Sequence, residues 1–174
     1  MKLLIASDIH GSAYWCCRLM EEIERESPDK VVLLGDLLYH GPRNDLPRDY
    51  NPKQVLAMLN DIASNIVAVR GNCEAEVDQM VLDFPCMADY ALLMDGSRQL
   101  YLTHGHLWNP DNLPPLADGT AFLYGHFHVK RNELIANPAG GMVRVVNPGS
   151  VSIPKDATNS YALYEDGEFI LRDL

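Results

Sequence analysis

The chain has 174 residues, of which 47% are hydrophobic and 22% are charged, and its formal net charge is −10 at pH 7. This length and composition are those of one globular unit with a substantial core, so residues 1–174 are expected to form a single domain. The negative charge repels polyanions, and no run of Lys or Arg offers a basic stripe, which disfavours unaided binding to nucleic acid.

The first 70 residues alternate between apolar strand-like runs and amphipathic helical segments. Ser12 is a candidate N-cap and Pro52 a candidate first helical residue, and both sharpen the helix boundaries. The βαβαβ order implies parallel strands joined by crossover helices. The expected elements are a strand over 2–7, a helix over 13–26, a strand over 30–34, a helix over 52–64 and a strand over 65–69.

The second half changes to short strands joined by tight turns. Asp95-Gly96 and Asp166-Gly167 are strong hairpin signals, and Gly140-Gly141 is a third turn. Two mixed β-sheets packed face to face and flanked by helices, a four-layer α/β/β/α sandwich, accommodate this order within the α/β class. The strands expected here cover residues 89–94, 99–103, 121–124, 132–136, 142–146, 161–164 and 169–172.

Neither a membrane segment nor a disulfide framework is expected. The opening apolar run is too short for a signal-peptide core and reaches an aspartate at position 8, and no later stretch approaches the roughly 20 apolar residues of a membrane span. The four cysteines, Cys16, Cys17, Cys73 and Cys86, show no CxxC spacing, which favours reduced thiols. These features predict a cytoplasmic protein.

Five of the six histidines belong to three pairs of polar residues with a spacing of two: Asp8 with His10, His104 with His106, and His126 with His128. Alternate side chains of an extended segment project to the same side, so each pair can direct two ligand atoms to one point. Each pair also follows an apolar strand-like run, and strand ends are where α/β proteins build sites. The pattern therefore indicates bound metal.

Two further polar residues, Asp36 and Asn72, follow other expected strands. A mixture of imidazole and carboxylate favours Zn, Mn, Fe or Ni over Ca or Mg. A central carboxylate can bridge two cations about 3.5–4 Å apart, and Asp36 is the candidate bridge. An Asp after Gly often serves only local hydrogen bonding in a turn, but three spaced pairs at strand ends are hard to attribute to structure alone.

The sequence resembles the calcineurin-like metallophosphoesterases through five motifs in order across positions 8–128. They are Asp8-x-His10, Gly35-Asp36, Gly71-Asn72, His104-Gly105 and Gly125-His126-x-His128. Segments 39–44, 69–74, 78–80, 112–114 and 147–154 further resemble the small bacterial YfcE-type phosphodiesterases.

The resemblance implies two divalent transition-metal ions, with Mn²⁺ expected first and Zn²⁺, Fe²⁺ or Ni²⁺ as alternatives. It implies one ion held by Asp8, His10, Asp36 and His128, and a second held by Asp36, Asn72, His104 and His126. It further implies that a hydroxide between the metals attacks a small phosphodiester in line. A locally cationic centre would draw such a substrate into an acidic protein.

One position departs from the family pattern. Many relatives have His after the Gly-Asn step, where it resembles a general acid or a clamp on the phosphate, whereas this chain has Cys73 beside Asn72. A thiol with a pKa near 8.5 donates a proton to an alkoxide less readily than imidazolium does, and it lacks the positive charge. We therefore expect a preference for good leaving groups such as aryl oxides.

Other polar residues near the motifs have two interpretations. Arg43 is suited to contacting phosphate but is also typical of a solvated loop. His106 is either a hydrogen-bonding partner of a ligand or a contact with substrate. Asn147 and Ser150 either brace the wall of the site or form a turn. For Trp108, core or rim packing is favoured over a substrate contact.

Three functions remain in competition at this point. A metal-dependent phosphodiesterase is the leading one, and a phosphomonoesterase would need a more positive pocket than Arg43 alone provides. A eukaryotic retromer subunit resembles this fold while serving as a scaffold, so a non-catalytic interaction protein is the alternative from another class. The sequence leaves open the natural substrate, the physiological metal and whether the protein forms a homo-oligomer.

Overall fold

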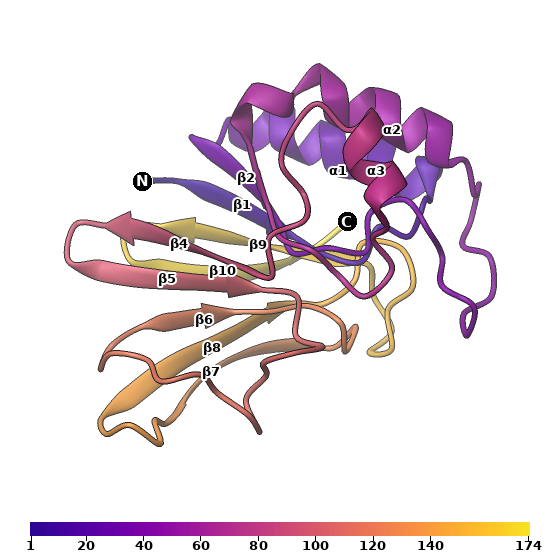
Figure 1. The fold of residues 1–174 in the computed structure, drawn as a ribbon. Coiled ribbons are helices and arrows are strands. Elements are labelled where there is room, and N and C mark those ends of the chain that lie inside the picture. The colour runs from indigo at the N-terminus through magenta and orange to yellow at the C-terminus, as the bar shows by residue number, and fades with distance from the viewer.

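A computed structural model describes residues 1–174 as two five-stranded mixed sheets packed face to face (Figure 1). The first sheet has the strand order β10-β9-β1-β2-β3 and the second has the order β4-β5-β6-β8-β7. The strands are β1 (Leu3–Ala6), β2 (Lys30–Leu33), β3 (Ile66–Ala68), β4 (Tyr90–Asp95), β5 (Arg98–Thr103), β6 (Ala121–Leu123), β7 (Lys130–Ala136), β8 (Met142–Pro148), β9 (Ser160–Glu165) and β10 (Glu168–Asp173).

The helices are α1 (Ala13–Glu26), α2 (Pro52–Asp61) and the short α3 (Glu76–Val81). The Ser12 hydroxyl caps α1 by accepting a hydrogen bond from the Trp15 N–H, and Asn51 caps α2 in the same way. Helix α1 stops at Ser27, whose left-handed φ of 46° ends the helical path. None of these helices is long and apolar enough to cross a membrane.

Three apolar layers hold the elements together, and the alternation of side chains along each strand assigns residues to them. The first layer packs α1 and α2 against the outer face of the first sheet. The second lies between the sheets, where Ile5 and Leu34 meet Leu102 and Leu123. The third covers the outer face of the second sheet. The central strands β1 and β6 are therefore buried on both faces.

The fourth layer differs from the expected helical one. The outer face of the second sheet carries no helix (Figure 1); residues 104–120 cover it instead, placing Trp108, Leu113 and Leu116 on Phe122 and Tyr124. The segment contains Pro110, Pro114 and Pro115, and prolines at this density interrupt helical hydrogen bonding. Trp108 has the packing role that the sequence favoured, with edge contacts to Tyr90 and Tyr101.

The α/β class with two mixed sheets is confirmed. The parallel pairing of β1 with β2 and of β2 with β3 is as expected, and so are the hairpins β4-β5, β7-β8 and β9-β10. Two local differences occur: α2 ends at Asp61 and is followed by a 3₁₀ turn at Ala63–Asn65, and the sequence did not indicate α3. At six residues, α3 is too short for a recognisable apolar period.

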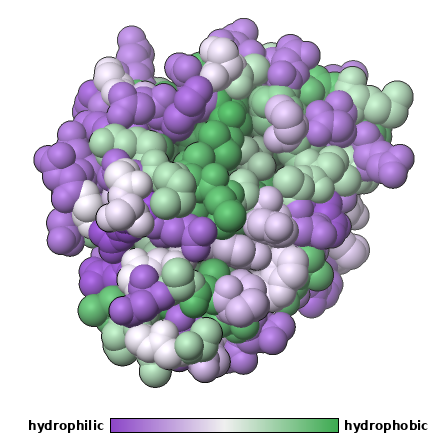
Figure 2. Space-filling view, turned by 60° about the vertical axis from the view of Figure 1, so that its left-hand side comes forward, coloured by the Kyte–Doolittle hydropathy of each residue, from purple (hydrophilic) through white to green (hydrophobic).

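The face of the molecule drawn in Figure 2 is mostly hydrophilic. In Figure 2, which brings the left-hand side of Figure 1 forward, polar residues surround a hydrophobic strip that runs from the upper part of the face to its centre. Exposed apolar side chains on the edge strand β4 are Tyr90, Leu92 and Met94. This end of the sandwich lies away from the loops described below.

Replacement of Gly35 by Ala should destabilise the protein far more than replacement of Gly96. Both glycines have positive φ, but an added Cβ at Gly35 would lie 2.4 Å from the main-chain nitrogen of Gly71, whereas at Gly96 it would meet nothing within 4 Å. Gly96→Ala should lower the free energy of unfolding by about 1–2 kcal/mol. Gly35→Ala should cost several times as much, and urea unfolding of both variants measures the difference. Equal losses would show that backbone conformation, not contact, decides the glycine at 35.

Candidate metal centre

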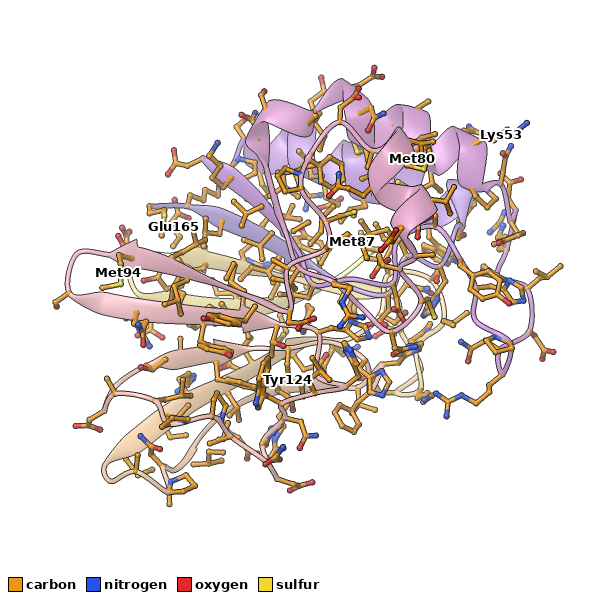
Figure 3. The ribbon with its side chains drawn as sticks, viewed as in Figure 1. Lys53, Met80, Met87, Met94, Tyr124 and Glu165 are labelled. Atoms are coloured by element: carbon orange, nitrogen blue, oxygen red, sulfur yellow. The ribbon has the colours of Figure 1, made fainter.

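The predicted ligands follow the carboxyl ends of parallel strands from both sheets. Asp8 and His10 follow β1, Asp36 follows β2, Asn72 follows β3, His104 follows β5, and His126 and His128 follow β6. Because β1, β2 and β3 run parallel in one sheet and β5 and β6 run parallel in the other, these ends meet at one edge of the sandwich. In Figure 3, Tyr124 at the end of β6 lies nearer this edge, whereas Met94 and Glu165 mark the opposite end.

The backbone of the ligand loops is unusual. Five of the predicted ligands have left-handed φ angles, which only glycine adopts readily: Asp8 (59°), His10 (48°), Asp36 (56°), His126 (66°) and His128 (59°). Each such residue costs on the order of 1–3 kcal/mol and persists only where its surroundings hold it. Hydrogen bonds between loops do so: the Asp8 N–H donates to Gly35 O, the His10 N–H to Asp36 O, and the Gly125 N–H to His104 O.

Three of the histidines are oriented by hydrogen bonds to main-chain oxygens. Each ring donates its Nδ1–H to a carbonyl: His10 to Tyr39 O at 2.8 Å, His104 to Leu34 O at 2.6 Å, and His128 to Ile153 O at 2.7 Å. The hydrogen bond at Nδ1 directs Nε2 toward the centre of the cluster, where a cation can replace the proton on that nitrogen. Such outer hydrogen bonds are typical of histidines that bind metal.

The ligand atoms form two groups. Asp8, His10 and His128 make one group, and Asp36, His104 and His126 make the other, with ligand atoms in each group within 4.8 Å of one another. Asp36 lies between them. Its Oδ1 accepts the Cys73 N–H at 2.8 Å, while its Oδ2 lies 3.6 Å from His10 Nε2 and 3.5 Å from His104 Nε2.

The donor set fits divalent cations. Asp8 Oδ1 is fully buried and makes no hydrogen bond, although it lies 3.1 Å from His128 Nε2 and 3.5 Å from His10 Nε2. A buried carboxylate oxygen with no well-formed hydrogen bond is costly, and a cation bound between it and the two imidazole nitrogens would satisfy all three atoms. Asn72 Oδ1 joins the second group at 3.2 Å from His104 Nε2.

The carboxylates dominate the electrostatics of the cluster. Burial by itself would raise the pKa of Asp8, but the imidazoles of His10 and His128 hold it well below its usual value. Burial likewise opposes the charging of His104, yet Asp36 and Asp8 raise its pKa to about 9. Burial and the neighbouring His104 lower the pKa of His126 to about 4. The ring of His126 is therefore neutral and available as a ligand near pH 7.

Sequence reasoning missed Glu74, which organises the loops after β2 and β3. This buried carboxylate accepts main-chain N–H groups of Asp36 at 2.9 Å and Leu37 at 2.7 Å, and also that of Gly71. Burial and the charge of Asp36 raise its pKa, and the three N–H donors oppose that rise. A charged residue three positions after Gly71 was the only available sign, and it resembles an ordinary turn residue.

Asn147 and Ser150 brace the wall of the site. The Asn147 amide donates to Gly125 O at 2.8 Å, and the hydroxyls of Ser150 and Ser152 both donate to Asp8 O, at 2.9 Å and 3.0 Å. Asn147 Oδ1 also accepts the Gly149 N–H, so the turn interpretation holds as well. These bonds tie the end of β8 and the segment after it to the ligand loops after β1 and β6.

A cavity of about 340 Å³ opens onto the cluster. It is lined by His10, Asp36, Arg43, Asn44, Asn72, His126, Phe127, His128 and Lys155. Arg43 therefore lies at the site, together with Asn44, Lys155 and Phe127, which the sequence did not single out. Asp8 and His104 are buried beneath the cavity.

Two other candidate residues lie beside the cavity rather than in its wall. The His106 ring is 5.4 Å from the His104 ring and 6.3 Å from the His126 ring, and its buried Nδ1 has no hydrogen-bond partner. Cys73 Sγ lies within 4.8 Å of the ligand atoms of His10 and Asp36 and accepts a contact from the Asn72 amide at 3.2 Å.

Comparison with known proteins adds independent information. Residues 1–167 match the family model described as the calcineurin-like phosphoesterase superfamily domain. The chain is 46% identical over 155 residues to a protein named Phosphodiesterase YfcE from Escherichia coli (strain K12), covering 89% of this chain and 82% of the relative.

Solved structures with a similar fold were also found. The structure of YfcE, described as a phosphoesterase from E. coli, matches with a TM-score of 0.90 and 44% identity over 95% of this chain and 89% of that chain. A structure described as an archaeal phosphodiesterase covers 100% of each chain with a TM-score of 0.66 at 18% identity, which supports the fold alone.

Substitution of Glu74 by Gln should destabilise the loops that carry Asp36. The amide can accept at one end only, and its NH₂ group would face a main-chain N–H, so the free energy of unfolding should fall by about 1–3 kcal/mol. Urea unfolding measures the loss. The matched control, Glu76→Gln, changes an exposed side chain on α3 and should shift stability by less than about 0.5 kcal/mol. A Glu74→Gln protein as stable as the control would contradict this role.

Proposed function

The chain belongs to the calcineurin-like phosphoesterase superfamily, and on this premise we propose that it hydrolyses small phosphodiesters at a centre of two divalent cations. The observation that carries the dinuclear centre is the position of Asp36. Its Oδ2 faces one histidine from each ligand group, His10 and His104, at nearly equal distances. A carboxylate placed in this way suits a bridge between two cations.

The residues divide between the two cations as follows. Asp8, His10, Asp36 and His128 would hold one, and Asp36, Asn72, His104 and His126 would hold the other, consistent with the two spatial groups. When bound, the two cations would neutralise charge on the phosphate and lower the pKa of a water at the site. Mixed imidazole and carboxylate ligands favour Mn²⁺, Zn²⁺, Fe²⁺ or Ni²⁺ over Ca²⁺ or Mg²⁺, and the family resemblance places Mn²⁺ first among them.

The chain itself supplies the binding of the phosphate. Arg43 and Lys155 place two cationic side chains at the wall of the cavity, and Asn44 and Asn72 add amide groups. Guanidinium and ammonium groups donate to the non-bridging oxygens of a phosphodiester. Local positive charge of this kind offsets the repulsion expected from a net charge of −10.

Cys73 limits proton donation to the leaving group. Burial, followed by the charge of Asp36, raises the pKa of the thiol, so it remains neutral and holds its proton tightly. Asn72 lies beside it and would contact the phosphate from the same loop. We therefore expect aryl oxides, which depart without protonation, to be better leaving groups than alkoxides.

The remaining expectations form part of the same proposal. Residues 1–174 act as one catalytic domain in the cytoplasm, and the substrate is a small phosphodiester, not nucleic acid. A phosphomonoester carries one more negative charge than a phosphodiester, and Arg43 and Lys155 could also bind it. The relative rates on a monoester and a diester therefore decide between the two activities. An interaction scaffold would need no intact ligand set.

Hydrolysis of bis(p-nitrophenyl) phosphate should require a divalent cation and the Asp36 carboxylate. We expect Mn²⁺ to support turnover and a chelator to abolish it. Asp36→Asn should lower kcat by more than about 100-fold, because loss of a ligand costs more than the 10–100-fold typical of changes to a ligand's hydrogen-bond partner. The release of p-nitrophenolate provides the measurement.

Asp61→Asn is the matched control because Asp61 is exposed at the end of α2, and its rate should stay within about twofold of the parent. Full activity in Asp36→Asn, or a rate independent of metal, would favour the scaffold. Faster cleavage of p-nitrophenyl phosphate than of the diester would favour the phosphomonoesterase.

Cys73→His should raise the rate on diesters with alkoxide leaving groups. Imidazolium protonates a departing alkoxide and adds positive charge, and general acid catalysis typically contributes 10²–10⁴-fold, so a gain of at least about tenfold is expected. The gain should be smaller with an aryl oxide. Cys73→Ser changes the same site without adding an acid and should show no gain. An unchanged or lower rate in Cys73→His would contradict this role for position 73.

A further inference from the structure

Phe127 occupies an unusual place for a large apolar residue. It lies between the predicted ligands His126 and His128, whose left-handed φ angles of 66° and 59° turn the chain sharply. The Phe127 N–H donates to Gly125 O at 2.7 Å, which closes the turn. The two histidines then face the metal centre, and the ring between them projects outward with 42% of its surface exposed.

The core does not account for this ring. Phe127 belongs to none of the three apolar layers. Its aromatic contacts are edge-on, with Tyr124 at 5.9 Å and His126 at 5.3 Å between ring centroids. Tyr124 is itself buried and also contacts Phe122. The ring therefore keeps much of its surface accessible to a ligand.

Two cavities share Phe127. It is the single hydrophobic residue in the wall of the 340 Å³ cavity over the metal centre. It also lines a neighbouring cavity of about 270 Å³ with Tyr124, labelled in Figure 3, and Val129. The charged and polar wall of the first cavity suits a phosphate group. The second cavity offers space and apolar surface beside the same ring.

We propose that the Phe127 ring recognises a planar aromatic ester group on the substrate, such as an aryl ring or a nucleobase, while Arg43 and Lys155 contact the phosphate. This deepens the proposed phosphodiesterase function and rests on it. A planar group can stack on the ring and extend into the second cavity, whereas a small alkyl ester group would leave the ring exposed. Phe127 is therefore a specificity-determining residue that favours aromatic over small alkyl phosphodiesters.

Binding of two phosphonates to the Mn²⁺-loaded protein tests the proposal without turnover. Phenylphosphonate and methylphosphonate present the same anionic group and differ in one substituent. By titration calorimetry, the parent protein should bind phenylphosphonate at least about fivefold more tightly, in keeping with one aromatic contact. In Phe127→Ala the ratio should fall below about twofold, and in Phe127→Tyr, which keeps the ring, it should be preserved.

Methylphosphonate provides the internal control for the metal centre, because its affinity should be the same in the parent and in Phe127→Ala. Tyr90→Ala, which removes an exposed aromatic ring from β4 at 49% exposure, should leave the ratio unchanged. Three outcomes would overturn the proposal: no preference in the parent, an unchanged ratio in Phe127→Ala, or an equal loss of both affinities in that variant. The last would mean that Phe127 acts only by shaping the ligand loop.

The outcomes also separate this inference from the proposed function. If bis(p-nitrophenyl) phosphate is not hydrolysed but phenylphosphonate is preferred through Phe127, the activity is wrong and the aromatic subsite stands. If the diester is hydrolysed and the preference is absent, the activity stands and the subsite is wrong. Failure of both phosphonates to bind the loaded protein would overturn the subsite.

Discussion

The close approach of the loops after β2 and β3 is the constraint on which the rest of the site depends. Gly35 packs against the backbone of Gly71, where a Cβ would lie 2.4 Å from its nitrogen, and the buried Glu74 carboxylate collects N–H groups from both loops. This contact leaves Asp36 one fixed orientation. Its Oδ1 is held by the Cys73 N–H, so its Oδ2 is left to face His10 and His104.

The site is built at the expense of local conformational energy. The left-handed backbone conformations of Asp8, Asp36 and His128 are individually unfavourable. Hydrogen bonds and burial around the loops offset their conformational energy. Such loops deliver ligands within a few residues of a strand end, where the scaffold is most rigid. The same turn that aims His126 and His128 inward leaves Phe127 outside. The proposed metal ligation and the proposed recognition of the ester group would therefore arise from one three-residue segment.

Charge is distributed to suit an anionic substrate. The protein as a whole is acidic, and buried carboxylates concentrate negative charge beneath the cavity, where divalent cations would balance it. Arg43 and Lys155 add positive charge at the cavity wall. A phosphodiester would thus meet favourable charge at the site, while the net charge of −10 disfavours larger polyanions. The neutral thiol of Cys73 is the one element of this arrangement that does not favour departure of a poor leaving group.

The sequence by itself determined the order of the strands, the two longer helices and the hairpin turns, because apolar periodicity and glycine turns are local features. It also predicted seven metal ligands, through spaced polar pairs and the resemblance to a family. Helix α1 and the parallel β1-β2-β3 arrangement follow from such features. Only the tertiary structure decided which ligand atoms meet, that residues 104–120 replace a helical layer, and that Glu74, Lys155 and Phe127 belong to the site. These residues are joined by contacts between loops far apart in the chain, and no local pattern records such contacts.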